Sequence, residues 1–358
     1  MIISRTPFRI SFFGGGTDYP AWYREHGGAV LSTSINKYCY ISCRYLPPFF
    51  KYKYLIRYRV REEVSALTEI EHASVRECLK YLGIEHGIEM VHTSDLPGQS
   101  GIGSSSAFTV GFLKALYALV GRMVGKRHLA AEAIFIEQKV IGENVGSQDQ
   151  VAASFGGLNR IEFNAQEDFT VQPVTIGQRK TTELQNHLML FFTGFSRTAS
   201  EIAAEQIKNT ASKAAELRAM HQMVDEAAGV LSSPTSGIED FGRLLHESWR
   251  LKRTLSTRIT TSAIDQMYEA AIGAGAIGGK LCGAGGGGFL LLFVPPRRRR
   301  LVQRALHDLL YVPFQFETLG SQITYYADEG PYLDHRTTGT FVEVAASRAR
   351  PLEPVEAM

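Results

Sequence analysis

The stretch PGQSGIGSSS, residues 97–106, brings three glycines and four serines together directly before an apolar segment. The run AFTVGFLKALYALVG follows at residues 107–121, and we expect a helix over roughly 105–120. The preceding residues, IEMVHTSDL, are typical of a strand. A strand, a glycine-rich loop and a helix N-terminus together form an anion-binding geometry, because free amides point outward and the helix dipole is positive there. The loop is therefore either a phosphate-binding loop or a plain capped turn.

The residue types of this loop exclude two common phosphate loops. Gly98, Gly101 and Gly103 allow positive φ angles and close approach of a ligand to the backbone. The serines that follow add hydroxyl donors and can cap the helix. However, the lysine of the GxxxxGK[ST] pattern is missing, and the glycine spacing differs from the dinucleotide-binding fingerprint.

The composition of the chain is that of a soluble globular protein. It has 358 residues, of which 44% are apolar and 21% charged, and a net charge of +2. This charge gives no field that recruits nucleic acid or membrane, so we expect neither as a partner. The four cysteines form no CxxC pair, which favours reduced thiols and a cytoplasmic location. No signal-peptide layout and no membrane-spanning apolar run is seen.

The length predicts two domains, which we divide at 1–180 and 181–358. The first half mixes strands and helices, and the second is rich in helices with strands of its own. The segment LPPFFKYKYLIRYRVREE resembles an RNA-stacking strip, but an edge strand or hairpin is favoured. The arginines at 297–300 suggest a nucleic-acid patch or, with better support, a solvated helix start. Further elements are expected as a helix ended by Gly142, strands within 156–176 and at 187–195, helices over 197–274 with one break at SSPTSG, a strand after the glycines of 283–288 and a last strand in VPFQFET.

A carboxylate, Glu137, shares a helix face with the apolar Ile134 and Ile141. Burying a carboxylate is costly unless a cation pairs with it or it is protonated. A magnesium ion between Glu137 and a loop serine would satisfy it. A partner arginine or a boundary position would do so as well.

Three further segments carry candidate residues. PFRISFFGGGTDYP, residues 7–20, ends a strand in three glycines before Asp18, which could bind sugar hydroxyls or cap a turn. ENVGSQDQVAASFGG places Asp149 among small and amide residues, where a helix cap is the plain interpretation. KLCGAGGGGFLLLF, residues 280–293, is either a linker or a tight loop between a helix and a buried strand.

The three glycine-rich segments together resemble the three motifs of the GHMP kinase superfamily. PFRISFFGGGTDYP resembles motif one, DLPGQSGIGSSSAFTVGFL the phosphate loop of motif two, and KLCGAGGGGFLLLF motif three. The resemblance implies an α+β fold of two domains, the first like domain 2 of ribosomal protein S5 and the second ferredoxin-like, with the active site between them. It also implies ATP and Mg2+ as cofactors.

Within the superfamily, FGGGTD and FTGFSRTASEIAAEQ resemble D-glycero-D-manno-heptose 7-phosphate kinases and related sugar kinases. That resemblance implies phosphorylation of a sugar phosphate at its anomeric hydroxyl, heptose 7-phosphate to the 1,7-bisphosphate, for nucleotide-activated heptose and cell-surface polysaccharide synthesis. The alternatives are another GHMP sugar or small-alcohol kinase and a non-catalytic sugar and ATP sensor. The oligomeric state is open, with a homodimer among the alternatives.

The resemblance also implies roles for individual residues. Ser105 and Glu137 would hold magnesium, Asp149 would orient or deprotonate the acceptor hydroxyl, and Arg9 would lie beside Asp149. The nucleotide phosphates would bind the loop residues Pro97, Gly98, Gly101, Ile102, Gly103, Ser104, Ser105 and Ser106. Motifs one and three would contribute substrate contacts from Gly15, Gly16, Thr17, Asp18, Gly283, Gly285 and Gly286.

A phosphate on the acceptor sugar requires a cationic subsite. Arg197, in GFSRTAS, is expected at a helix start with hydroxyl residues nearby, which suits an anion. Lys37 is a second candidate, and a plain surface position is the alternative for Arg197.

Overall fold

Two long antiparallel strands form the centre of the molecule. The computed structural model describes residues 1–194, 199–327 and 329–332. In it β1 (Ile2–Phe13) pairs with β2 (Gly28–Tyr45), with Ile10 opposite Thr33. β1 is buried on both faces over its second half although Phe8 to Phe12 alternate apolar and polar residues, since Arg9 and Ser11 are themselves only 4% and 5% exposed. That half of β1 ends in the glycine turn of motif one.

The larger sheet has nine strands within the described residues. Its main order is β13-β1-β2-β5-β3-β4, β6 and β12 also pair with β2, and β7 pairs with β6. The expected hairpin is confirmed as β3–β4, and β4 lies at the sheet edge. The bounds are β3 (Tyr54–Arg57), β4 (Arg61–Val64), β5 (Ile88–Ser94), β6 (Leu158–Phe163), β7 (Phe169–Pro173), β12 (Phe316–Glu317) and β13 (Gln322–Tyr326).

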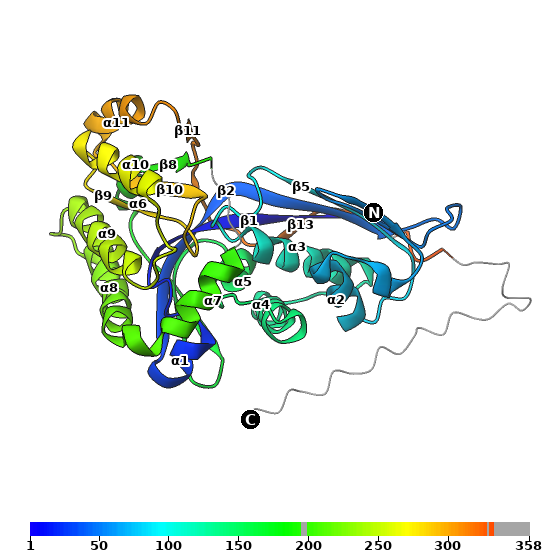
Figure 1. Cartoon of the computed structure of the whole chain (residues 1–358). Helices are drawn as coiled ribbons and strands as arrows, with labels where there is room; N and C mark the ends of the chain where they lie inside the picture. The colour runs from blue at the N-terminus through cyan, green and yellow to red at the C-terminus, as the bar shows by residue number, and fades with distance from the viewer. Residues whose placement is uncertain (195–198, 328, 333–358) are drawn as a thin grey trace, which may run out of the picture.

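Helices cover one face of this sheet, as Figure 1 shows for α2, α3 and α4. The helix expected after the glycine-serine loop is confirmed as α3, which is almost wholly buried against β1 and β2. The helix expected to end at Gly142 is also confirmed, although its last turn is a π-helix. The elements are α1 (Pro20–His26), the 3-10 turn Leu67–Glu69, α2 (Ala73–Tyr81), α3 (Ser104–Leu119), α4 (Lys126–Phe135), the π-helix Ile136–Ile141 and α5 (Gln148–Phe155).

A smaller antiparallel sheet lies in the second half of the chain. Its order is β11-β8-β10-β9, and the buried β8 and β10 confirm the two apolar strands expected there. The strands are β8 (Leu188–Phe192), β9 (Gly278–Leu281), β10 (Phe289–Phe293) and β11 (Leu310–Tyr311). The helices are α6 (Gln178–His187), α7 (Ala199–Asn209), α8 (Ala214–Ser232), α9 (Ile238–Arg253), α10 (Ser262–Gly273) and α11 (Arg299–Ala305), with 3-10 turns at Ala211–Lys213 and Pro296–Arg298.

Helices α8 and α9 join the two sheets. α8 packs on β1 and β2, while α9 contacts β1 and β9. Phe241 of α9 makes edge contacts with Phe12 and Phe13, at ring-centroid distances of 5.4 and 5.1 Å. Such aromatic pairs stabilise by more than their buried area alone. Because these rings end β1, the same packing fixes motif one against the second half of the chain.

The structure corrects three details of the sequence expectations. The strand in VPFQFET is not the last, because β13 follows and pairs with β1. The helical region is also interrupted at 210–213, by a 3-10 turn, and at 254–261, and α6 occupies the expected boundary. The residues of β13, QITYY, favour a strand, but its pairing with β1 gives no local signal because the two strands are about 320 residues apart in sequence. The division at residue 180 stays a prediction, with the addition that residues 316–326 return to the larger sheet.

The arginines at 297–300 form the start of a helix, as expected, and Arg299 donates to the carbonyl oxygens of Asn186 and Leu188 at 2.7 and 2.9 Å. Among the described helices, none has both the length and the apolar character needed to cross a membrane.

Candidate active site

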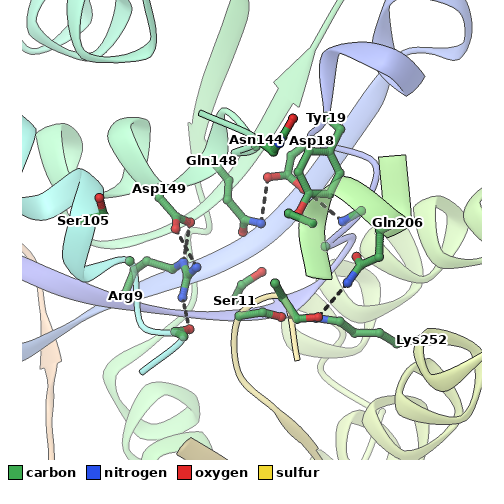
Figure 2. A pocket seen from close by; sticks show the side chains of 18 of the residues that line it. Arg9, Ser11, Asp18, Tyr19, Ser105, Asn144, Gln148, Asp149, Gln206 and Lys252 are labelled. Atoms are coloured by element: carbon green, nitrogen blue, oxygen red, sulfur yellow. Dashed lines mark hydrogen bonds and ion pairs between the residues drawn. The ribbon is translucent and has the colours of Figure 1, made fainter. Parts of the chain in front are cut away.

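A cleft lies where the three glycine-rich segments meet (Figure 2). Its lining comes from the turn after β1, the start of α3, residues 144–149 before and in α5, and the loop after β9. Helices α7 and α9 contribute from the second half of the chain. The structure therefore brings together segments that are far apart in sequence and that the motifs assigned to one site.

An ion pair between Arg9 and Asp149 lies on the wall of this cleft. Arg9 Nε donates to Asp149 Oδ1 at 2.7 Å, and a terminal guanidinium nitrogen donates to Oδ2 at 2.8 Å. Burial alone would lower the pKa of Arg9, but the Asp149 charge and hydrogen bonds raise it above its ordinary value. The Asp149 side chain is still 23% exposed, so the pair presents a carboxylate to the cleft.

Arg9 also fixes the glycine-serine loop. Its second terminal nitrogen donates to the Gly101 carbonyl at 2.7 Å, and its backbone amide donates to the Ile102 carbonyl at 3.1 Å. Gly103 caps α3 in the left-handed conformation, with φ 75°, and a Cβ there would lie 3.4 Å from the Asp149 carboxyl. One side chain thus links the loop to Asp149, and the glycine keeps the space between them open.

The loop residues divide into an open side and a buried side. Ser104 and Ser105 line the cleft at the start of α3, where free amides and the helix dipole favour an anion. Ser106 and Ile102 are buried. Pro97 and Gly98 are exposed at the far end of the loop, outside the residues that line the cleft.

Glu137 is a buried carboxylate behind the loop, in the π-helix. Ser106 Oγ donates to its Oε2 at 2.8 Å, and Gln150 Nε2 donates to the same oxygen. Oε1 has no partner among the described residues. Burial raises the pKa of Glu137 to about 7. π-helical turns are frequent at functional sites, and this one carries the acidic residue that the motifs assign to magnesium.

A divalent cation fits this environment, because an unpartnered buried carboxylate oxygen is a suitable ligand for magnesium. The serine that bonds Glu137 is Ser106, whereas Ser105, which was expected to hold the metal with it, is exposed toward the cleft. No group of three or more acidic, histidine or cysteine residues forms a metal cluster in the part of the chain that is described. The metal roles of Ser105 and Glu137 stay predictions.

Asp18 is buried beside the motif-one turn. The amide of Gly16 donates to Oδ1 and Gln148 Nε2 donates to Oδ2, both at 2.9 Å. Burial raises the pKa of Asp18 in spite of these hydrogen bonds. The Asp18 side chain as placed leaves no room for a side chain at position 146, since a Cβ on Gly146 would lie 1.9 Å from Asp18 Oδ2. Thr17 lies outside the lining, because its hydroxyl donates to the carbonyls of two residues within the fold, Gly14 and Ala29.

Two buried lysines that the sequence did not indicate as site residues also line the cleft. Lys280 donates to the carbonyls of Ser11 and Phe12, at 2.8 and 3.1 Å, and Lys252 donates to the Gly283 carbonyl. Burial lowers the pKa of Lys252 to about 8 and that of Lys280 well below its ordinary value. Lys280 is the first residue of the segment that resembles motif three. The sequence did not indicate Lys252 as a site residue, because ESWRLKR is typical of the exposed end of a helix.

The motif-three loop contacts motif two through backbone. A Cβ on Gly283 would lie 2.3 Å from the Cα of Gly101, so neither position has room for a side chain. Gly283 and Ala284 line the cleft, while Gly285 and Gly286 face Ile259 instead. The contact between the loops confirms a tight loop rather than a linker.

Of the two candidates for a substrate-phosphate cation, the structure describes Lys37 and does not describe Arg197. Lys37 lies in an irregularity of β2, between the positions opposite Pro7 and Phe8, and is not among the lining residues. Arg197 lies outside the described residues.

Comparison with known proteins identifies the family. The model for the GHMP kinases N terminal domain matches residues 70–157, and that for the GHMP kinases C terminal region matches residues 230–312. A Campylobacter jejuni protein named D-glycero-alpha-D-manno-heptose 7-phosphate kinase is 30% identical over 308 residues, which cover 79% of this chain and 86% of that protein. This chain belongs to the GHMP kinases. The first match contains the glycine-serine loop, Glu137 and Asp149, and the second contains both buried lysines.

Solved structures agree with this membership of the GHMP kinases. One from Bacteroides thetaiotaomicron, described as a D-glycero-D-manno-heptose 1-phosphate kinase, has a TM-score of 0.73 and 25% identity, covering 92% of this chain and all (100%) of that one. A Streptococcus pneumoniae phosphomevalonate kinase, in complex with phosphomevalonate and AMPPNP, has a TM-score of 0.70 at 17% identity, covering 88% and 100%. The expected two-domain fold is confirmed, and the chain is an ATP-dependent small-molecule kinase.

Proposed function

We propose that this GHMP kinase transfers the γ-phosphoryl group of ATP to the anomeric hydroxyl of a sugar phosphate, converting D-glycero-D-manno-heptose 7-phosphate to the 1,7-bisphosphate. The observation that carries the proposal is the Arg9–Asp149 pair, which presents a carboxylate to the cleft beside the start of α3. The names of the Campylobacter and Bacteroides relatives, both heptose phosphate kinases, support the acceptor class.

The acceptor side of the mechanism uses Asp149. An anomeric hydroxyl is more acidic than an ordinary alcohol, so a nearby carboxylate suffices to orient it and accept its proton. Arg9 holds both oxygens of Asp149, yet each carboxylate oxygen has a further lone pair for the acceptor hydroxyl. The guanidinium keeps the carboxylate fixed in the cleft while the proton is transferred.

The nucleotide side uses the backbone of the glycine-serine loop. The first amides of α3, with the hydroxyls of Ser104 and Ser105, would bind the phosphate oxygens, where charge is spread during transfer. Glu137 and a loop serine would hold Mg2+, which neutralises phosphate charge when it is bound. Arg9 also bonds the Gly101 carbonyl of this loop, so one side chain fixes both the nucleotide-binding loop and the carboxylate that would contact the acceptor.

A substrate panel tests the proposal. ADP release is measured with heptose 7-phosphate, mannose 6-phosphate, fucose and galactose, and the phosphorylated carbon of the product is assigned by NMR. Heptose 7-phosphate is expected to give the highest kcat/KM, with the new phosphate on C1. Preference for an unphosphorylated sugar, or phosphate on another carbon, would contradict the proposal.

A further inference from the structure

Three polar side chains converge on the cleft surface at Gly15, in the motif-one turn. A Cβ built on Gly15 would lie 3.9 Å from Ser11 Oγ, 3.9 Å from Gln148 Nε2 and 4.0 Å from Lys252 Nζ. These residues come from β1, α5 and α9, and all line the cleft. All three are more than nine-tenths buried, with exposures of 5%, 8% and 4%.

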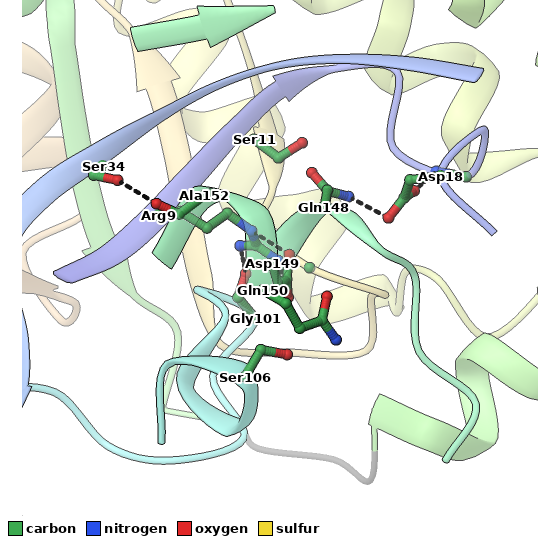
Figure 3. Close-up of polar contacts among 12 residues, drawn as sticks. Arg9, Ser11, Asp18, Ser34, Gly101, Ser106, Gln148, Asp149, Gln150 and Ala152 are labelled. Carbon is green, nitrogen blue, oxygen red and sulfur yellow. Dashed lines mark hydrogen bonds and ion pairs between the residues drawn. The ribbon is translucent and has the colours of Figure 1, made fainter. Parts of the chain in front are cut away.

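Two polar atoms of these side chains lack a hydrogen-bond partner among the described residues. Within residues 1–194, 199–327 and 329–332, neither Ser11 Oγ nor Gln148 Oε1 forms a hydrogen bond. Figure 3 shows the Ser11 hydroxyl and the Gln148 amide beside one another, with the amide nitrogen directed to Asp18. Buried polar groups nearly always form hydrogen bonds, and a buried group without a partner costs free energy of folding. The pair therefore indicates a ligand that supplies the missing hydrogen bonds.

The chemistry of the unpartnered atoms selects the ligand group. Gln148 Oε1 accepts only, so the ligand must carry a donor, whereas Lys252 only donates, so it must also carry an acceptor. A hydroxyl does both. A phosphate dianion has no donor, and it would approach the carboxylate of Asp18, which Gln148 contacts at 2.9 Å. The cleft wall at Gly15 thus suits a neutral hydroxyl better than a phosphate.

We propose that Ser11, Gln148 and Lys252 form a hydroxyl-binding subsite above Gly15 that selects and orients the acceptor sugar. The inference rests on the proposed function in one respect: the acceptor is a polyol whose reacting oxygen lies at Asp149. Lys252 also donates to the Gly283 carbonyl, so the same ammonium connects the acceptor subsite to the motif-three loop. This assigns acceptor selection in part to α9, outside the three motifs.

Gly15→Ala is the sharpest variant, since it fills the space without straining the fold. The backbone of Gly15 is not in the left-handed region, and the added methyl would meet its neighbours at ordinary contact distances of 3.9–4.0 Å. We expect the KM for the acceptor to rise about tenfold or more, by loss of the hydrogen bonds made there, with the KM for ATP unchanged.

Ser11→Ala tests whether this side chain and one hydroxyl of the acceptor form a single interaction. The wild type and the variants are assayed with acceptor analogues that each lack one hydroxyl. For one analogue, we expect the wild type to lose about tenfold in kcat/KM and Ser11→Ala to lose nothing further, because the two changes remove one interaction. Lys252→Met is expected to show the same coupling to that hydroxyl. Lys180→Met is its matched control, since Lys180 Nζ likewise donates to a backbone carbonyl, that of Ser236 at 2.8 Å, outside the cleft.

The outcomes separate the subsite from the proposed function. The assays use whichever acceptor the wild-type kinase phosphorylates, so a different preferred sugar overturns the heptose assignment and leaves the subsite testable. An unchanged acceptor KM in Gly15→Ala, or losses that simply multiply for every analogue in Ser11→Ala, would overturn the subsite. A rise in the KM for ATP equal to that for the acceptor would also overturn it, since a general distortion of the cleft would then explain the result.

Discussion

Two carboxylates near the glycine-serine loop are held in opposite ways. Asp149 faces the cleft and is bound through both oxygens by the guanidinium of Arg9. Glu137 is fully buried, receives hydrogen bonds only from neutral side chains within the described residues, and has its pKa raised to about 7 by burial. Asp149 therefore has a cationic partner within the fold, whereas the described part of the chain offers Glu137 none. The difference suggests that Asp149 contacts the acceptor hydroxyl and that Glu137 binds a cation that arrives with the nucleotide.

Removing the charge of Asp149 has the largest expected effect. Asp149→Asn keeps the shape but removes the proton acceptor, so turnover should fall by about 10²–10⁴-fold, the usual contribution of a positioned acid–base group. Binding of AMPPNP, measured by calorimetry, should remain close to that of the wild type. Near-normal turnover would show that Asp149 does not accept the proton.

Removing the charge of Glu137 changes stability in a pH-dependent way. Its folded-state pKa of about 7 lies above the ordinary 4.5, so the folded protein binds this proton more tightly than the unfolded chain. The free energy of unfolding of the metal-free protein should therefore fall as pH rises from 4.5 to 7, by about 3 kcal/mol from this group. Glu137→Gln should lack this component, as urea unfolding at pH 5 and pH 7.5 would measure.

Adding magnesium and a nucleotide analogue to the wild type and to Glu137→Gln tests whether Glu137 binds a cation. If Glu137 awaits a cation, the ligands should restore stability above pH 7 in the wild type and restore much less in Glu137→Gln. Equal restoration in both proteins would remove Glu137 from the metal site.

The neighbouring serines give the smallest expected effects. Ser106→Ala removes a donor to Glu137 and should lower the free energy of unfolding by about 1–3 kcal/mol, the usual cost of removing a hydrogen-bond partner from a buried polar group. Ser105→Ala, at an exposed position, should change stability by no more than about 0.5 kcal/mol while weakening binding of the magnesium–nucleotide complex. The reverse pattern would exchange the roles of the two serines.

The sequence predicted the local features of the site better than its long-range ones. The glycine-serine loop and α3 followed from residue type and period, and Arg9, Asp18 and Asp149 were all placed in one cleft as expected. Which serine faces Glu137 could not be predicted, because successive residues of a helix point about 100° apart and one position decides the contact. Lys252 was missed for a different reason. Its burial depends on packing between α9 and the motif-three loop, and its charge matches that of its exposed neighbours.

A crystal structure with AMPPNP, magnesium and the acceptor sugar would test the roles of the glycine-serine loop and of Asp149 together. We expect the β- and γ-phosphates against the first amides of α3, the acceptor oxygen within hydrogen-bond distance of Asp149, and the Arg9–Asp149 pair retained. A triphosphate bound away from the start of α3, or an acceptor whose reacting oxygen lies far from Asp149, would contradict these roles.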